Sequence, residues 1–354
     1  MKTTFNRRDV LKAGTALTAS TLFAEPIRAA APPAEAVTPA LVEAARKEGK
    51  VVHYTSVDLP LAEKVAKAFE AKYPGIAVRT ERTGAERVFT RIAQERSSNI
   101  HACDVVQSSD AAHFVVWKRE GILAPYVPEE VAQHYPSAHK DPDGLFASYR
   151  VYLCVMARNT DLVKAEDAPK SYKDLLDPKW AGKIVKAHPG YSGTILTATY
   201  QTARDVGWDY YEKLAKQRVM QVQSASDPPK KLALGERAIM ADGGEYVVSD
   251  MMSRGEPIEA VYPTEGTPLI TGPSAIMVRA PNPNAARLFH AWSMTAEGQQ
   301  VSIDVGGMRS VHPATRERPG RPKLADIKTM REEASVVADK ADEIKAQYVK
   351  YFKV

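Results

Sequence analysis

The chain has 354 residues, more than one hydrophobic core usually supports, so we expect two lobes. Hydrophobic residues make up 44% of it, as in an ordinary globular protein. The formal net charge of +5 falls mostly on residues 1–30, and no cluster of Lys and Arg alternates with aromatic residues, so nucleic-acid binding has no support.

The first 30 residues predict an export signal. The stretch "NRRDVLKAGTALTASTLFA" places Arg7 and Arg8 before a short apolar run, and small residues at 29–31 offer a cleavage site. The run is too short, and too interrupted by Lys12, to span a bilayer comfortably. We therefore expect residues 1–30 to be a twin-arginine signal peptide and the mature protein to be exported to the periplasm.

Alternating strand and helix patterns follow. "GKVVHYTSVD" (49–58), "IAVRTERT" (76–83) and "CDVVQSSD" (103–110) read as strands, with helical spacing of apolar residues at 61–73 and 85–97. This order predicts parallel βαβ units, whose ligands bind at the carboxyl ends of the strands. The polar residues at those ends are Ser56, Asp58, Ser109 and Asp110.

Two long extended stretches divide the rest of the chain. "SYRVYLCVMA" (148–157) and residues 258–278 are long enough to cross between lobes, and further α/β segments lie between them. The last 30 residues read as a charged helix on the outside. The predicted fold class is α/β with two lobes and two crossover strands. Lobe 1 comprises residues 38–148 and 264–354, with the C-terminal helices, and lobe 2 comprises residues 149–263.

The stretch "HPGYSGT" (188–194) presents a serine before a helix, and two functions are open to it. A hydrolase nucleophile needs Gly-x-Ser-x-Gly, but here Thr194 stands where the last glycine should be, and only two histidines follow Ser192. The other function is an anion site at a helix N-terminus, where Gly193 lets the backbone approach the ligand. We expect the second, and no enzymatic activity. Ser192 is also a good helix N-cap.

Several stretches together resemble the iron(III)-type family of ABC-transporter solute-binding proteins, which have the type II periplasmic-binding fold. The resemblance covers essentially the whole mature chain. It rests on "VVHYTS", "AFEAKYPGI", "CDVVQSSDAAHF", "DLLDPKWAGKIV", "GYSGT", "LALGERAIMADGGEY", "YPTEGTPLITGPSAI" and "NAARLFHAW". It implies a protein that closes two lobes over a small solute and delivers it to an ABC permease in the inner membrane.

The resemblance also bears on the ligand. Ferric-binding members hold iron with a histidine, a glutamate and two tyrosines, and these positions fall on Asp58, Ser109, Gly244 and Glu245 here. Other members carry phosphorylated sugars or phosphonates, and such anionic solutes, or an organic acid, fit these residues better. We expect no metal and no cofactor. The expected ligand-binding residues are Ser56, Asp58, Ser109, Asp110, Arg150, Ser192, Gly193, Thr194, Asp242, Glu245 and Tyr246, with Arg150 as a counter-charge.

Two alternatives to solute import by this route remain. One is ferric iron binding for iron uptake, and the other is a sensor that presents its liganded form to a membrane histidine kinase. We expect a monomer. Cys103 and Cys154 lie in apolar, strand-like runs and are expected to be buried free thiols.

Overall fold

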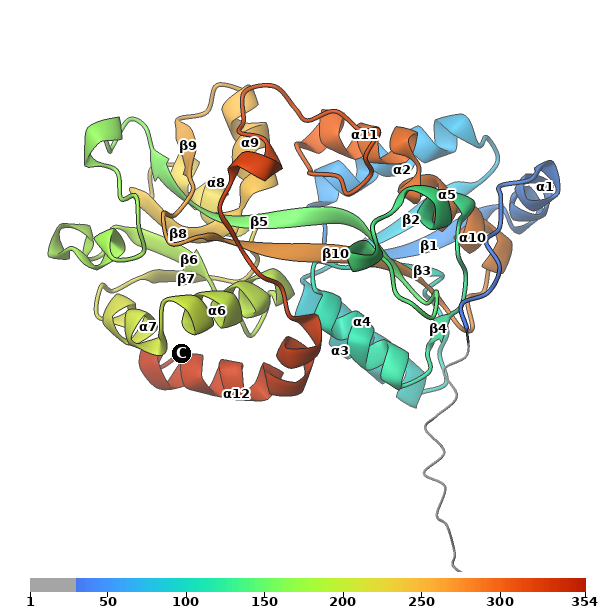
Figure 1. The fold of residues 1–354 in the computed structure, drawn as a ribbon, viewed down its shortest axis with the longest axis horizontal. Coiled ribbons are helices and arrows are strands. Elements are labelled where there is room, and N and C mark those ends of the chain that lie inside the picture. The colour runs from blue at the N-terminus through green and yellow to red at the C-terminus, as the bar shows by residue number, and fades with distance from the viewer. Residues whose placement is uncertain (1–29) are drawn as a thin grey trace, which may run out of the picture.

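The computed structural model describes residues 30–354, so the predicted signal peptide lies almost wholly outside the described residues. The strands join in one sheet with the order β2-β1-β3-β10-β5-β8-β6-β7 (Figure 1). The short strands β4 and β11 pair with β10, and β9 pairs with β5. Their bounds are β1 Lys50–Thr55, β2 Ala77–Arg82, β3 Val105–Gln107, β4 Leu123–Ala124, β5 Ala147–Asn159, β6 Ile184–Ala187, β7 Met220–Val222, β8 Ile239–Gly244, β9 Ile258–Val261, β10 Thr267–Met277 and β11 Thr329–Met330.

Twelve α-helices within residues 30–354 cover the two faces of this sheet. Among these residues no helix combines the length and the apolar character needed to cross a bilayer. The helices are α1 Pro39–Glu48, α2 Leu59–Lys72, α3 Ala85–Ser97, α4 Ala111–Arg119, α5 Glu129–His134, α6 Gly193–Asp205, α7 Trp208–Ala215, α8 Asp227–Ala233, α9 Glu245–Ser253, α10 Pro283–Met294, α11 Ala296–Gly306 and α12 Ala334–Phe352.

Each lobe is built on parallel strands, as the alternating pattern predicts. In lobe 1, β1 pairs in parallel with β2 and β3, and buried Phe69, Phe289 and Trp292 form the core beneath α2 and α10. In lobe 2, β6 pairs in parallel with β7 and β8, over a core that includes Ile184 and Ile239. The carboxyl ends of these strands therefore carry the loops that face the other lobe.

Strands β5 and β10 belong to both lobes and confirm the two predicted crossovers. They pair with each other in an antiparallel manner from Ala147–Ser274 to Leu153–Leu269, with a bulge between Gly272 and Pro273. All 13 residues of β5 are buried, because helices and loops cover both of its faces. A side chain on this strand consequently lies at the junction of the lobes.

A third segment, residues 307–330, also passes from lobe 1 to lobe 2 (Figure 1). It leaves α11 and crosses β5, where the amide of Val151 donates to the carbonyl of Arg309 at 3.1 Å. It then leads to β11 and α12. The lobe division expected from the sequence places the C-terminal helices on lobe 1, but α12 contacts α4 of lobe 1 and also α6 and α7 of lobe 2. The sequence could not reveal this, because the charged face of a helix does not identify its neighbours.

Candidate functional site

The polar ends of β1 and β3 meet at the junction of the lobes. Ser56 follows β1 and Ser109 follows β3, and both are buried. The Ser56 hydroxyl lies 3.1 Å from the Ser109 hydroxyl and accepts a hydrogen bond of 2.9 Å from the Ser109 amide. Thr194 of lobe 2 donates to the Ser109 carbonyl at 3.5 Å. The structure therefore brings these three predicted residues together across the two lobes.

Arg150 of β5 is a buried cation without an acidic partner. Arg150 is only 1% exposed, its Nε and Nη2 atoms have no hydrogen-bond partner, and Nη1 donates a weak hydrogen bond to the Met308 sulfur at 3.8 Å. A buried charge normally has a counter-ion, because leaving water without one costs several kcal/mol. An Arg that keeps free donors at the lobe junction can therefore bind an anion, which a guanidinium favours as a planar, multidentate donor.

Tyrosine rings surround Arg150. Its guanidinium lies 4.3 Å from the ring centre of Tyr152 and 5.1 Å from that of Tyr149, both within cation–π range. Tyr246 packs edge-on against Tyr152 at 5.1 Å. The hydroxyl of Tyr149 is buried and unpartnered. Sequence reasoning missed Tyr149 and Tyr152, although the alternation in "SYRVY" marks them as flanking Arg150 on one strand.

The Arg150 side chain packs against Gly272, its partner on β10, where any larger residue would collide with it. A Cβ at Gly272 would lie 2.7 Å from Arg150 Nε, closer than real atoms approach. His53, on β1, is also buried and unpartnered. Burial lowers its pKa to about 3, and the charge of Arg150 adds to that effect, so His53 is neutral and brings no second cation.

The start of α6 confirms Ser192 as a helix N-cap. The Ser192 hydroxyl accepts from the Ile195 amide at 3.4 Å. Its own hydrogen remains available to a ligand, since a hydroxyl both donates and accepts. The following residue, Gly193, packs against lobe 1, because a Cβ there would lie 2.6 Å from both Cβ and Oδ2 of Asp110. The predicted anion cradle thus lies at the contact between the lobes.

Asp110 begins α4 and reaches into lobe 2. Its Oδ1 atom accepts from the Ala112 amide at 3.0 Å and from the Thr197 hydroxyl at 3.2 Å, whereas Oδ2 is buried without a hydrogen-bond partner. Burial raises the pKa of this carboxyl to about 6, a rise that His113 opposes. Asp110 is therefore placed to respond to the closing of the lobes.

Asp58 also joins the lobes, at the mouth of the junction. Its carboxylate pairs with Lys230 of lobe 2 at 2.9 Å, and its amide donates to the Tyr246 hydroxyl at 3.4 Å. A cavity of about 210 Å³ opens here, and Arg254 contributes to its lining with these three residues. Deeper, beside Tyr152 and Tyr246, the space is only about 10 Å³, room for about one water molecule.

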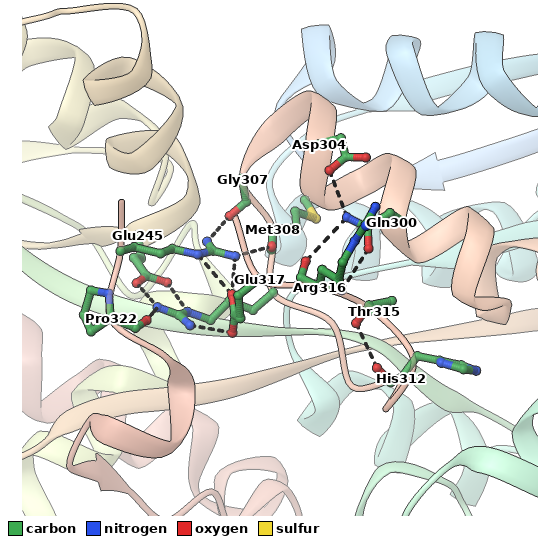
Figure 2. Close-up of polar contacts among 12 residues, drawn as sticks. Glu245, Gln300, Asp304, Gly307, Met308, His312, Thr315, Arg316, Glu317 and Pro322 are labelled. Carbon is green, nitrogen blue, oxygen red and sulfur yellow. Dashed lines mark hydrogen bonds and ion pairs between the residues drawn. The ribbon is translucent and has the colours of Figure 1, made fainter. Parts of the chain in front are cut away.

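The two remaining predicted acids, Asp242 and Glu245, have partners elsewhere. Asp242 pairs with buried Lys186 at 3.0 Å. Glu245 accepts two hydrogen bonds of 2.7 Å from the guanidinium of Arg309, and one of 2.5 Å from Tyr262. Figure 2 shows Glu245 beside Glu317 and Pro322, which also contact Arg309. Asp242 thus supports β8 and Glu245 supports the start of α9, the helix that carries Tyr246.

Arg82, which sequence reasoning missed, completes the inter-lobe contacts. It is the last residue of β2 and donates from Nη2 to Ser224 at 3.1 Å and to Ser226 at 3.4 Å, both in lobe 2. The only signal for Ser224 and Ser226 was the "SAS" after a predicted strand. The two cysteines, Cys103 and Cys154, are buried and free, as predicted, and burial raises the pKa of both thiols.

Comparison with known proteins places the chain in a class. The family model of the bacterial extracellular solute-binding proteins matches residues 103–323, and the chain belongs to this family. It is a periplasmic substrate-binding protein of an ABC transporter and not an enzyme, which confirms the expectation of no enzymatic activity.

Two individual relatives share about a quarter of their aligned residues with this chain. An uncharacterised protein of Haemophilus influenzae is 27% identical over 274 residues, which are 74% of this chain and 78% of that protein. The probable ABC transporter periplasmic-binding protein y4fP of Sinorhizobium fredii is 24% identical over 65% of this chain and 66% of its own length.

Among solved structures, the periplasmic binding protein AfuA of Actinobacillus pleuropneumoniae, with exogenous fructose-6-phosphate bound, superposes with a TM-score of 0.79. It is 25% identical, over 87% of this chain and 99% of AfuA. Iron-bound HitA of Pseudomonas aeruginosa superposes with a TM-score of 0.72 at 20% identity, over 84% of this chain and 99% of HitA, a likeness of fold alone. These matches confirm the predicted two-lobe periplasmic-binding fold.

Proposed function

We propose that this protein captures a small anionic solute between its lobes, with Arg150 as the counter-ion. The observation that carries the proposal is the buried guanidinium of Arg150, whose Nε and Nη2 atoms have no partner. In a closed, ligand-bound protein such a group would be matched by a phosphate, phosphonate or carboxylate. The fructose-6-phosphate bound to AfuA supports a phosphorylated sugar among these classes.

The remaining predicted residues would complete the site. The hydroxyls of Ser56, Ser109, Ser192 and Thr194 can donate to the anion or to a sugar, and the amides at the start of α6 favour negative charge. Tyr152 and Tyr246 offer flat apolar faces to a carbon skeleton. Asp58 and Asp110 would accept from ligand hydroxyls, while Asp242 and Glu245 act as supports.

Ferric iron fits this site less well. The positions corresponding to ferric ligands hold Asp58, which pairs with Lys230, and Glu245, which pairs with Arg309. Hard trivalent iron needs several anionic oxygen donors, and a free guanidinium beside them would repel it.

The experiment is a thermal-shift screen of fructose 6-phosphate, a phosphonate and an organic acid against uncharged fructose, followed by calorimetry. A ligand that binds only the folded protein raises the melting temperature, and the rise grows roughly with the logarithm of its concentration above the dissociation constant. In Arg150→Met, a charge-assisted contact is lost, so the dissociation constant should rise about 10- to 150-fold. Unchanged anion affinity in this variant would refute the proposal.

Arg158→Met is the matched control. Arg158 lies on the same strand β5 and is also buried, but it pairs with Glu259 and with the carbonyl of Val163. Its loss should lower stability and leave anion affinity nearly unchanged, because these partners belong to lobe 2 and lie apart from Arg150.

We further propose that the solute passes to an ABC permease, that the protein acts as a monomer, and that the twin-arginine leader directs its export. Replacing Arg7 and Arg8 together by lysine should retain the precursor in the cytoplasm. Fractionation of cells that express either the wild type or the lysine variant gives the measurement. Export of the lysine variant would contradict the twin-arginine route.

A further inference from the structure

The end of α12 is held firmly by lobe 2. The Tyr348 side chain is fully buried, and its hydroxyl accepts from Lys186 Nζ at 3.0 Å and donates to Gln221 at 2.7 Å. The Lys186 ammonium also lies 4.5 Å from the Tyr348 ring centre. Phe352 stacks on Tyr348 at 4.3 Å. These contacts are aromatic and dehydrated, so they resist separation in water.

Asp339 and Lys345, which precede Tyr348 on α12, form ion pairs with lobe 1. The Lys345 ammonium contacts the Glu86 carboxylate of α3, and Asp339 lies 2.5 Å from Arg119 of α4. Lys345 is 28% exposed at its side chain, and Arg119 and Asp339 are more than half exposed. Partly hydrated ion pairs exchange readily with water and are weakened by salt. The contacts of α12 with lobe 1 are thus weaker than those that Tyr348 and Phe352 make with lobe 2.

Lys345 docks onto a buried cluster of titratable groups. His113 Nε2 lies 2.9 Å from Glu86 and 3.8 Å from Asp110 Oδ2. Glu332 lies near this cluster. Burial raises the pKa of Glu332 to about 7, and the charge of Asp110 adds to that rise, although Glu332 accepts a hydrogen bond from the Thr271 hydroxyl. Glu86, Asp110 and His113 are close enough to share a metal ion. However, Lys345 and a protonated His113 already balance the two carboxylates, so the arrangement favours an ion-pair network.

We propose that α12 moves with lobe 2 and clasps lobe 1 when the lobes close, with Lys345 docking on Glu86. The clasp rests on the proposed closing of the protein around a solute, but it acts whether or not a solute is present. Closing also brings Ala112 of α4 against the apolar cluster that Val337 and Ile344 of α12 form with Leu196 of α6. The C-terminal helix thereby sets how much of the population is closed.

The test measures the separation of the lobes without any ligand. Spin labels are placed on introduced cysteines at two exposed positions, Lys67 on α2 and Lys216 after α7, since both native cysteines are buried. Lys345→Met keeps the length of the side chain and removes its charge. It should raise the ratio of open to closed molecules about two- to fivefold, as expected for a partly exposed ion pair. Lys340→Met, on the same helix at an exposed position, should leave the distance distribution unchanged.

Tyr348→Phe distinguishes the two ways in which α12 could be attached. It removes the hydrogen bonds to Lys186 and Gln221, so it should lower the melting temperature but leave the lobe separation as in the wild type. If Tyr348→Phe opens the lobes and Lys345→Met does not, α12 belongs to lobe 1 and the proposal is wrong. Coincident distributions for the wild type and Lys345→Met would also overturn it. Neither result depends on Arg150 or on the identity of the solute.

Discussion

The carboxylate of Asp58 lies 2.9 Å from the ammonium of Lys230, and this ion pair joins lobe 1 to lobe 2 at the mouth of the cleft. The two residues are 172 positions apart in the chain. Asp58 begins α2 without capping it, so its side chain is free to serve the contact between the lobes. Each lobe thus supplies one partner of this ion pair, so the pair forms only when the two lobes are in contact.

Lys230→Met should weaken solute binding modestly. The pair is 19% exposed at Asp58 and 47% exposed at Lys230, and such pairs contribute about 0.2–1 kcal/mol. The dissociation constant of the solute found in the screen should therefore rise about two- to fivefold at low salt, with a smaller effect at high salt. Lys231→Met is the control, since Lys231 pairs with Glu236 inside lobe 2. Equal effects of the two variants would contradict an inter-lobe role.

Ser192→Ala should lower both stability and affinity, because the hydroxyl caps α6 and can also donate to the solute. Loss of an N-cap costs about 1 kcal/mol of unfolding free energy, and loss of a hydrogen bond to a charged group weakens binding about 10- to 150-fold. Ser192→Gly separates the two roles, since glycine at an N-cap costs only a few tenths of a kcal/mol. Calorimetry should then find weakened binding at near-normal stability. Normal affinity in both variants would leave Ser192 as a cap only.

Gly193→Ala should impair closing rather than folding. The new Cβ would lie 2.6 Å from Asp110 across the junction, within lobe contacts that the open protein does not make. We expect the melting temperature of the ligand-free variant to change little and the affinity for the solute to fall at least tenfold. Small-angle scattering should show no compaction on adding solute. Compaction equal to that of the wild type would contradict the packing described for Gly193.

Closing of the lobes should be favoured by mild acid. Burial raises the pKa of Asp110 from its usual value to about 6, so the closed form takes up a proton as the pH falls below 6. The pKa of His113 is also raised: burial lowers it, but the charges of Asp110 and Glu86 outweigh that effect. Stabilisation by protonated His113 is thus complete below its usual pKa and is lost as the pH rises through the raised value. Both groups therefore favour the closed form as the pH falls toward and through 6.

The opposite trend should begin at lower pH. The pKa of Glu86 is lowered by His113 and Lys345 against the effect of burial, so its contribution is lost only when the pH falls through that lowered value. The spin-label distances of the ligand-free protein at pH 5, 6, 7 and 8 give the measurement. Asp110→Asn keeps the shape and removes one titration, so it should flatten the dependence below pH 6. A pH response identical to that of the wild type would exclude Asp110 as its source.

The sequence determined the elements of the fold because their signals are local. Apolar spacing and turn residues predicted the two crossovers that became β5 and β10, and the start of α6 at Ser192. Polar residues at the ends of predicted strands correctly placed Ser56 and Ser109 at the junction, since parallel strands end at one edge of a sheet. An apolar setting was likewise enough to predict buried thiols at Cys103 and Cys154.

Only the tertiary structure decided which charges are free. Arg150, Asp242 and Glu245 looked equally available in the sequence, but Glu245 meets Arg309 and Asp242 meets Lys186, whereas Arg150 meets no acid. Glu86 and Lys345, 259 residues apart, likewise become partners only because α12 spans the lobes. The sequence gives the charge of a side chain, but its partner depends on packing between distant segments. At the junction of the lobes, this packing leaves Arg150 without an acidic partner.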